Sequence, residues 1–549
     1  WHNRDVIFVQ RLSITLRLQT SSTLGRALHI TEGDGMKVQV AFAALIFTAL
    51  VATQTKAWEF ENWPMYGKDP SHSFSNPLTQ INARNVASLT PAWTFPAGDA
   101  VTASPAVVDG VVYVGSWDGF FYAIDAGTGQ LRWKVQVDCQ PSVVPLPQVC
   151  GGPAAGTSTP SRFQTPGGII TASAAVLDNR VYFGGGRTLY SLSASDGQII
   201  WKHVICGNPE DTNCASDQND PLQILSSPVV SAGKIYVGVS TGGVNFGIPY
   251  RGGFLAFDAK TGEQQWRFEV DADRPNGVNR GCGNVWSSPA LDPEAQMVFF
   301  GTADCEEQPL PPYHGAVVAL DATSGRPAWV FRPRESDPNK CDFDFGASPN
   351  LIDSGEQRAV GIGGKDGTYY LLDRATGTKL WATRVVFGGG EGGFFGGAAV
   401  DGRRIFSATA FGDGNVLTQT GLCDPGYHDP DNPNVVDTFV QDPSIHALAI
   451  ANGRVLNEQS DNQSVGATSL GNRVVFSGFI GLSETNLPAV KAYSQRLIPL
   501  AVLPSDVNGR PGMVNSTVVP VGRMLFFGSG NYFDGTGSGI HAYILSIGK

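Results

Sequence analysis

The stretch Ala-Ile-Asp-Ala-Gly-Thr-Gly-Gln-Leu-Arg-Trp, at residues 123–133, carries the pattern that decides the fold. A short strand ends at Asp125, the chain turns at Gly127-Thr128-Gly129, and a second strand follows that carries Trp133. The same pattern returns as Ala-Phe-Asp-Ala-Lys-Thr-Gly-Glu-Gln-Gln-Trp at residues 256–266. Glycine is expected at such turns because it adopts positive φ values without a steric cost. The motif therefore predicts an antiparallel hairpin that recurs along the chain.

The hairpin is the second half of a longer unit. Before it lie two further segments with strand character, 103–108 and 111–115, separated by a turn. Four short strands cannot bury both faces of their sheet alone, so the copies are expected to stack radially around an axis. The copies lie at 103–133, 181–201, 228–266, 289–329, 349–381 and, in weaker form without the tryptophan, near 392–460, 463–506 and 512–549. Eight copies predict an all-β, eight-bladed β-propeller with four-stranded antiparallel blades, and a seven-bladed ring is the alternative.

Two details of the repeat bear on how the blades are joined. The last copy ends at Ile547-Gly548-Lys549 without its fourth strand, so the segment that follows residue 57 is expected to supply this strand and close the ring. A tryptophan stands at one fixed place in five copies, which predicts that these side chains pack neighbouring blades together. The five are Trp133, Trp201, Trp266, Trp329 and Trp381.

The composition of the 549-residue chain agrees with such a fold and excludes others. It contains 67 glycines and only 16% charged residues, which disfavours a helical bundle or a coiled coil. Its 42% hydrophobic residues disfavour a disordered chain. A formal net charge of −11 disfavours a nucleic-acid-binding protein, because phosphate contacts require clustered lysine and arginine.

The beginning of the sequence has the features of an export signal. Residues 1–35 are predicted to be a leader without a structural role, and residues 36–57 to be a signal peptide cleaved after Ala57. The apolar run 38–52 is too short to span the ~30 Å hydrocarbon core of a membrane, so we expect no stable membrane insertion. Residues 58–549 are then a single propeller domain of a secreted or periplasmic protein.

The eight cysteines fit an exported protein, because disulfides form in oxidising compartments. Spacing suggests the local pairs Cys139/Cys150, Cys206/Cys214 and Cys282/Cys305, with Cys341 and Cys423 left for a longer link, although other pairings stay open. No Cys-x-x-Cys-His motif occurs, which argues against a covalently attached haem.

The string Ala-x-Asp-Ala-x-Thr-Gly-x-x-x-Trp resembles the tryptophan-docking repeat of pyrroloquinoline quinone (PQQ) dehydrogenases, and the resemblance extends over nearly all of residues 58–549. Within that family, residues 285–293 and 342–349 are most similar to polyvinyl-alcohol dehydrogenase-like proteins. The resemblance implies a PQQ on the propeller axis, a Ca²⁺ or lanthanide ion beside it, and an aspartate base. It implies oxidation of an alcohol, with secondary or polymeric alcohols as candidates, and transfer of electrons to a separate acceptor such as a cytochrome c.

Two residues match the family's cofactor contacts. Trp286 stands at the opening of a blade, before Ser287-Ser288-Pro289, and resembles the family's stacking residue; packing in the core is the alternative. Lys365, in a Gly-Gly-Lys-Asp-Gly turn, resembles the family's cation beside the quinone, where it would stabilise negative charge on the carbonyl oxygens. A solvated position on the surface is the alternative for Lys365.

Asp342 and Asp344 are candidates for the base and for metal ligands. They flank Phe343, and on an extended strand their side chains would point to one face, where two carboxylates favour a cation between them. Aligned without gaps to the family's Trp-Asp-Tyr-Asp-Gly string, Asp342 would be the base and Asp344 an additional metal ligand. A shift by two residues makes Asp344 the base. Ordinary turn carboxylates are the alternative.

The sequence also departs from the family pattern. Where the family has a metal-binding glutamate, this chain offers only Asn245, and where the family has an asparagine it offers Asp304. Phe395 stands where close relatives tend to have tryptophan, and the adjacent cysteine pair that covers the quinone in many relatives is absent. These departures leave open a second hypothesis, a propeller that has lost the quinone and serves as a binding scaffold.

Overall fold

The computed structural model describes the chain from residue 62 onward, with gaps between the described segments. They are 62–138, 169–217, 220–241, 250–271, 283–303, 311–335, 342–386, 388, 392–410, 417–418, 421–422, 444–481, 487–531 and 535–546. The predicted leader and signal peptide lie outside these residues. No helix in the described segments is long and apolar enough to cross a membrane.

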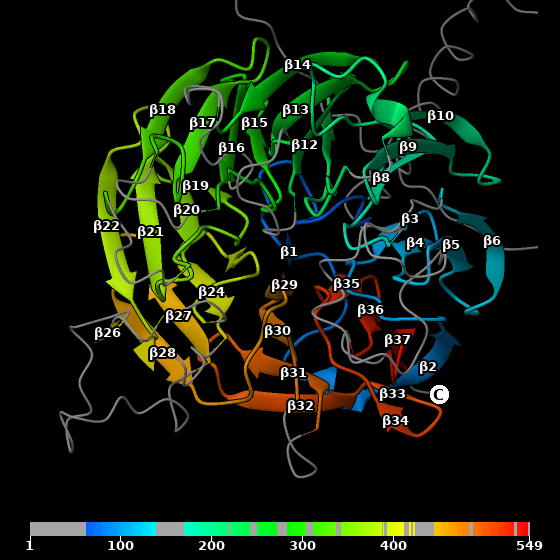
Figure 1. Ribbon diagram of the computed structural model, residues 1–549. Helices are drawn as coiled ribbons and strands as arrows, with labels where there is room; N and C mark the ends of the chain where they lie inside the picture. Colours follow the sequence, from blue (N-terminus) through cyan, green and yellow to red (C-terminus); the bar gives the residue numbers. More distant parts are fainter. Residues whose placement is uncertain are drawn as a thin grey trace, which may run out of the picture. The chain divides into compact units, whose positions relative to one another are not determined.

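Eight four-stranded antiparallel blades follow one another around a central axis, and β1 (Ser75–Asn76) adds a fifth strand to the sheet of blade 7 (Figure 1). Blade 1 consists of β3 (Ala106–Val108), β4 (Val111–Gly115), β5 (Phe120–Asp125) and β6 (Leu131–Gln136). Blade 2 consists of β7 (Ala175–Leu177), β8 (Arg180–Gly185), β9 (Thr188–Ser193) and β10 (Ile199–Val204). Blade 3 consists of β11 (Val229–Ser231), β12 (Lys234–Val239), β13 (Gly253–Asp258) and β14 (Gln264–Glu269), and blade 4 of β15 (Ala290–Asp292), β16 (Met297–Gly301), β17 (Val317–Asp321) and β18 (Pro327–Phe331).

Blade 5 consists of β19 (Asn350–Ser354), β20 (Gln357–Gly363), β21 (Thr368–Asp373) and β22 (Lys379–Arg384). Blade 6 consists of β23 (Ala399–Val400), β24 (Arg404–Ala408), β27 (Ile445–Ala449) and β28 (Val455–Gln459). Blade 7 consists of β29 (Ser469–Gly471), β30 (Val474–Phe479), β31 (Ala489–Ser494) and β32 (Pro499–Pro504), and blade 8 of β35 (Val519–Val521), β36 (Met524–Ser529), β37 (Gly539–Leu545) and β2 (Leu89–Pro96). Two small hairpins, β25 (Leu417–Thr418) with β26 (Gly421–Leu422) and β33 (Asp506–Val507) with β34 (Arg510–Pro511), and two 3₁₀ turns, η1 (Val86–Ser88) and η3 (Cys214–Ser216), complete the described elements. The predicted eight-bladed fold is confirmed, and the seven-bladed alternative is wrong.

The ring closes as the incomplete last repeat predicts. Strand β2 precedes blade 1 in the sequence but is the fourth strand of blade 8. It pairs antiparallel with the third strand, β37, from Leu89↔Leu545 to Pro96↔Gly539. In Figure 1 the blue β2 lies beside the red β37. Strands from the two ends of the described chain, β2 and β37, are therefore hydrogen-bonded neighbours.

The repeated tryptophans join neighbouring blades, as expected. Each indole N–H donates to a backbone carbonyl of the next blade; for Trp133 the acceptor is Ala194 O at 3.1 Å. The ring packs on a turn glycine there: a Cβ added at Gly197, whose φ is 75°, would lie 2.6 Å from Trp133 Cε3. Trp93 on β2 is a sixth member that the repeat search missed, and it donates to Ala126 O at 2.9 Å.

The stretch from Trp63 to Gln80, called here the axial segment, runs from blade to blade along the inner strands. Its carbonyls accept hydrogen bonds from the inner strands of blades 2, 4, 5, 6 and 7, its Trp63 pairs with Val107 in blade 1, and its Gln80 N–H donates to Gly522 O in blade 8. It includes β1 (Ser75–Asn76), which pairs in parallel with β29 and lies near the centre of Figure 1. It meets blade 4 at Leu291, five residues beyond Trp286.

Candidate active site

Three predicted site residues lie in neighbouring loops of blades 4 and 5. Trp286 stands four residues before the inner strand β15, and Asp344 six residues before the inner strand β19. Lys365 lies in the tight turn between β20 and β21 of blade 5. The two connectors are held side by side because the Ser288 N–H donates to Ser348 Oγ at 3.2 Å. The repeat geometry thus brings residues that are 58 and 79 positions apart in the sequence to one side of the axis.

Asp344 is the centre of the cluster. Its Oδ2 accepts a hydrogen bond from Trp286 Nε1 at 3.1 Å, and Lys365 Nζ lies 3.6 Å from its Oδ1. The Lys365 backbone N–H donates to Asp344 O at 3.0 Å, so turn and connector are also tied through the main chain. The side chains of Asp344 and Lys365 are only 5% and 6% exposed. A buried carboxylate with a cation on one oxygen and an indole N–H on the other is therefore fixed in place.

The environment of Asp344 favours its protonated form more than usual. Burial raises the pKa of the Asp344 carboxyl to about 7, although Lys365 and the Trp286 N–H both favour the charged form; the neighbouring Asp342 raises it further. Asp344 Oδ1 is buried and accepts no hydrogen bond from the part of the chain that the structure describes. A carboxyl group with a pKa near neutrality can both take up and release a proton at working pH.

Asp342 also reaches Lys365, but from a different environment. Its Oδ2 lies 2.5 Å from Lys365 Nζ, while its side chain is 51% exposed. The expectation that both aspartates lie on an extended strand is wrong, because the connector is irregular and Asp342 has a φ of 56°. The two carboxylates nevertheless converge, since both face the same ammonium group.

Aromatic rings border the cluster. Trp286 packs directly on Gly346, where an added Cβ would lie 1.6 Å from Trp286 Cη2. Phe395 stands four residues before the inner strand β23 of blade 6, the position that Trp286 has in blade 4. The two ring centroids are 6.1 Å apart with the planes tilted by 44°, and Lys365 Nζ lies 5.4 Å from the Phe395 centroid. The cation is thus placed between carboxylates and aromatic faces.

Asn245 and Asp304, the other two predicted metal ligands, lie outside the described residues. Within the described segments no group of three histidine, cysteine, aspartate or glutamate side chains could hold a metal ion. Asp342 and Asp344 are therefore the described part of the predicted metal site.

The sequence reasoning missed Arg334, which lies next to this cluster. Its Nη2 is 2.5 Å from Asp366 Oδ2, its Nη1 donates to Phe343 O at 3.3 Å, and its guanidinium carbon lies 4.5 Å from the Phe343 ring centroid. Asp366 also accepts a hydrogen bond from the Tyr370 hydroxyl at 2.5 Å. Its partner Asp366 lies in the string Lys365-Asp366-Gly367, which is similar to Trp117-Asp118-Gly119 in blade 1. This similarity marks a shared turn and does not point to Arg334.

Comparison with known proteins decides the family. Residues 63–386 match the PQQ family described as "Glucose/ethanol/alcohol dehydrogenase, beta-propeller domain". The chain belongs to the PQQ-dependent dehydrogenase family. The match spans blades 1 to 5, including Trp286, Asp342, Asp344 and Lys365.

Three relatives illustrate the range of this PQQ-dependent family. The chain is 30% identical to the quinate/shikimate dehydrogenase (quinone) of Acinetobacter baylyi, over 59% of this chain and 44% of the relative. It is 24% identical to the polyvinylalcohol dehydrogenase of a Pseudomonas species, over 66% and 56%. The solved quinohemoprotein alcohol dehydrogenase ADHIIG of Pseudomonas putida HK5 has the same fold, with a TM-score of 0.64 at 19% identity over 89% of this chain and 81% of that one. The chain spans about half the length of the curated relatives it matches.

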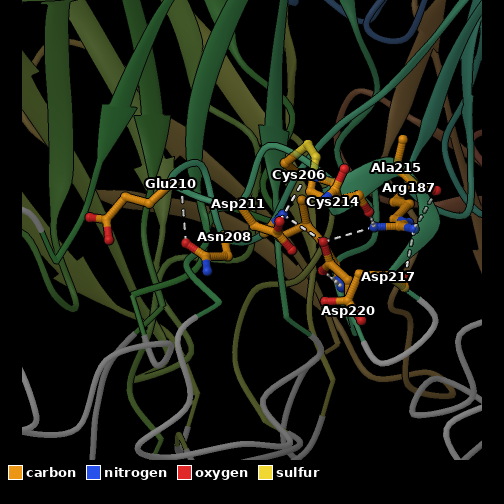
Figure 2. The surroundings of a disulfide bond; sticks show 12 residues. Arg187, Cys206, Asn208, Glu210, Asp211, Cys214, Ala215, Asp217 and Asp220 are labelled. Atoms are coloured by element: carbon orange, nitrogen blue, oxygen red, sulfur yellow. Dashed lines mark hydrogen bonds and ion pairs between the residues drawn. A yellow bond between two sulfur atoms is a disulfide. The ribbon is translucent and has the colours of Figure 1, made fainter.

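This member of the PQQ-dependent family contains a disulfide between Cys206 and Cys214, in the connector from β10 to β11. Figure 2 shows Arg187, from the β8–β9 turn, with its guanidinium facing Cys214 and the chain that follows it. Arg187 donates to Cys214 O and Asp217 O and pairs with Asp220 at 2.9 Å. The predicted Cys206/Cys214 pair is confirmed; the other six cysteines lie outside the described residues.

Proposed function

We propose that this chain is an exported PQQ-dependent dehydrogenase that oxidises an alcohol and passes the electrons to a separate acceptor. The observation that carries the proposal is the buried Asp344, which is hydrogen-bonded to Trp286 and faces Lys365. Burial of a carboxyl with a strongly raised pKa beside a specific cation is typical of a catalytic site.

The residues present fit a flat, anionic quinone. A planar ring needs an aromatic surface to stack on, and Trp286, whose ring packs on Gly346, is only partly buried. Lys365 supplies the positive charge that a quinone carbonyl requires as it gains electron density. Trp286, Lys365 and Phe395 would therefore contact the cofactor. When bound, PQQ supplies the two-electron oxidant for the alcohol.

Asp344 is the better candidate for the base. Its Oδ1 faces Lys365 at 3.6 Å and accepts no hydrogen bond from the described residues, so it can take the hydroxyl proton of an alcohol, while Trp286 Nε1 holds the other oxygen. Asp342 was the preferred base in the gapless alignment. With its half-exposed side chain and its 2.5 Å contact to Lys365, Asp342 instead suits the role of orienting the lysine. Lys365 would in turn favour the charged form of Asp344, against the effect of burial.

The same carboxylates suit a hard cation. Asp342 and Asp344 carry carboxylate oxygens of the kind that Ca²⁺ and lanthanide ions prefer, and Asn245 and Asp304 would complete the set. A cation bound by these carboxylates would also offset the free-energy cost of burying the charge of Asp344. The substrate class, a primary, secondary or polymeric alcohol, and an acceptor such as a cytochrome c follow from family resemblance. Export to the periplasm or the medium follows from the predicted signal and agrees with the Cys206–Cys214 disulfide.

The deciding experiment is reconstitution of the purified chain with PQQ and either Ca²⁺ or La³⁺. Quinone binding is followed by quenching of tryptophan fluorescence, with Trp286→Phe as the matched variant. Turnover is followed by alcohol-dependent reduction of a dye. We expect saturable quenching and turnover with at least one metal. If neither metal supports quinone binding, the enzymatic function is wrong and the scaffold hypothesis stands.

A further inference from the structure

Blades 1 and 5 share a locked turn between their second and third strands. In blade 1, Asp118 Oδ1 accepts from Phe120 N at 2.9 Å and Asp118 Oδ2 from the Tyr122 hydroxyl at 2.5 Å. In blade 5, Asp366 makes the same two contacts, with Thr368 N at 3.0 Å and the Tyr370 hydroxyl at 2.5 Å. This aspartate–tyrosine pair is therefore a structural feature of the blade and does not by itself indicate a function.

The two turns differ in the next contact of the aspartate. Asp118 Oδ2 receives a backbone N–H, that of Gly98, at 2.9 Å. Asp366 Oδ2 receives the Arg334 guanidinium at 2.5 Å instead. In blade 5 both donor and acceptor carry a charge, whereas the Gly98 N–H is neutral, and the planar guanidinium can use its other N–H groups for a second partner.

Arg334 uses that capacity to hold the connector that carries the two aspartates. Its Nη1 donates to Phe343 O and its guanidinium lies over the Phe343 ring at 4.5 Å. Phe343 separates Asp342 from Asp344, and Asp366 follows Lys365 directly. A single side chain thus ties the residue between the carboxylates to the residue next to the lysine.

The backbone bond that joins these two loops has a counterpart in blade 1. Lys365 N donates to Asp344 O at 3.0 Å, and Trp117 N donates to Ala100 O at 2.9 Å. Trp117 and Ala100 occupy the same repeat positions as Lys365 and Asp344. Blade 1 makes this bond without an arginine, whereas in blade 5 two carboxylates lie beside it and would repel each other if the lysine moved away.

We propose that Arg334 is a positioning residue: by bridging Asp366 and Phe343, it holds Lys365 against Asp342 and Asp344 in the geometry required for proton transfer. The catalytic part of this inference rests on the proposed function. Arg334 touches none of the reacting groups, so its loss should disturb their alignment more than cofactor or substrate binding. Misplacement by about 1 Å can cost as much as ~100-fold in rate.

The test compares Arg334→Met with Arg334→Lys and with Arg132→Met, which removes an exposed ion pair to Asp125 in blade 1. In the reconstituted enzyme we expect Arg334→Met to lower kcat about 10- to 100-fold, with KM and the quinone dissociation constant within about 3-fold of wild type. Arg334→Lys keeps the charge opposite Asp366 and should recover part of the loss. Arg132→Met should behave as wild type.

A second readout requires no activity. Hydrogen–deuterium exchange followed by mass spectrometry should show the peptide that contains the Lys365 amide exchanging about 10-fold faster in Arg334→Met, and the peptide that contains the Trp117 amide unchanged. If the wild type neither binds PQQ nor turns over, the proposed function fails, and this exchange still decides whether Arg334 holds the two loops. Unchanged exchange, or an unchanged kcat in an active enzyme, overturns the positioning role. Equal acceleration at both peptides would also overturn it, because it would indicate a general loss of stability.

Discussion

Asp342 and Asp344 are two residues apart, yet water reaches their side chains very differently. Asp344 is buried and bonded to Trp286, whereas Asp342 is 51% exposed and touches only the lysine end of the cluster. If Asp344 is the base, Asp344→Asn should lower kcat by about 10²- to 10⁴-fold, because the amide keeps the shape but cannot take a proton. Asp342→Asn should lower it by about 10-fold or less. Steady-state kinetics of both reconstituted variants, each checked for folding by circular dichroism, measure this.

The order of the two effects decides the assignment. A larger loss in Asp342→Asn than in Asp344→Asn would return the base to Asp342, as the gapless alignment had it. Equal losses would mean that the pair acts as one unit through Lys365, which lies within 3.6 Å of both.

Gly346 is the residue that gives the Trp286 ring its place. A Cβ at this position would lie 1.6 Å from Trp286 Cη2, so Gly346→Ala forces the ring to move. We expect the quinone dissociation constant to rise by about 10-fold or more, and the free energy of unfolding to fall by about 1–3 kcal/mol. The matched control is Gly127→Ala, where the nearest atom to the new Cβ is 3.5 Å away. Quinone binding as tight in Gly346→Ala as in wild type would show that Trp286 does not need this space.

The sequence could predict the cluster only in part. Trp286, Lys365 and the aspartate pair were found because a family resemblance marks their positions. The burial of one aspartate and the exposure of the other were not readable, because they depend on an irregular connector in which Asp342 has a positive φ. Arg334 could not be found at all, since it meets Asp366, 32 residues later, only through the packing of two loops.

At the scale of elements, the hairpins were predictable and the axial segment was not. Strand alternation, turn glycines and the repeated tryptophan are local signals that survive in a single sequence. The axial segment has no such pattern, because its structure comes from the strands around it. It carries polar residues, among them His72 and Asn76, that are buried only because the ring encloses them.

His72 makes the axial segment sensitive to pH. Burial lowers the pKa of His72 from 6.5 to about 4, although Asp69 and the Pro349 carbonyl favour the charged ring. The unfolded chain therefore takes up a proton near pH 6.5 that the folded chain refuses until about pH 4. Stability from this residue is complete above about pH 6.5, falls by about 3 kcal/mol as the pH drops to about 4, and then levels off.

The measurement is urea unfolding of wild type and His72→Asn at several pH values from 7 to 4. His72→Asn is expected to be less stable at pH 7, because Pro349 O loses its donor, but its stability should fall less steeply toward pH 4. His541, whose pKa burial also lowers to about 4, is present in both proteins and cancels in the comparison. Parallel pH profiles for the two proteins would contradict the assignment to His72.

At the scale of the whole molecule, eight similar blades are joined by unequal contacts. Six fourth strands carry a tryptophan that docks on the next blade, while Asn457 in blade 6 and Ala501 in blade 7 occupy the same position without one. The loss of the tryptophan that the sequence shows in the repeats of blades 6 and 7 therefore corresponds to a real difference in how these blades contact the next blade. The candidate active site lies in blades 4 and 5, whose fourth strands both carry a docking tryptophan. The loops of the site can differ in sequence from other blades, because the tryptophans and not these loops join the blades.

Ring closure gives the most direct test of that docking. If β2 closes the ring as an ordinary fourth strand, Trp93 should contribute as much to the free energy of unfolding as Trp133 does in blade 1. Each indole makes one hydrogen bond and packs on one turn glycine, Gly129 for Trp93 and Gly197 for Trp133. Trp93→Ala and Trp133→Ala should then each lower the free energy of unfolding by about 2–4 kcal/mol. Leu380→Ala, at an exposed position on β22, should change it by less than about 0.5 kcal/mol. Urea unfolding followed by circular dichroism measures all three. If Trp93→Ala resembles Leu380→Ala while Trp133→Ala is destabilised, β2 is a loosely attached edge and the ring is held closed by the axial segment, whose hydrogen bonds to blades 1 and 8 cross the same junction.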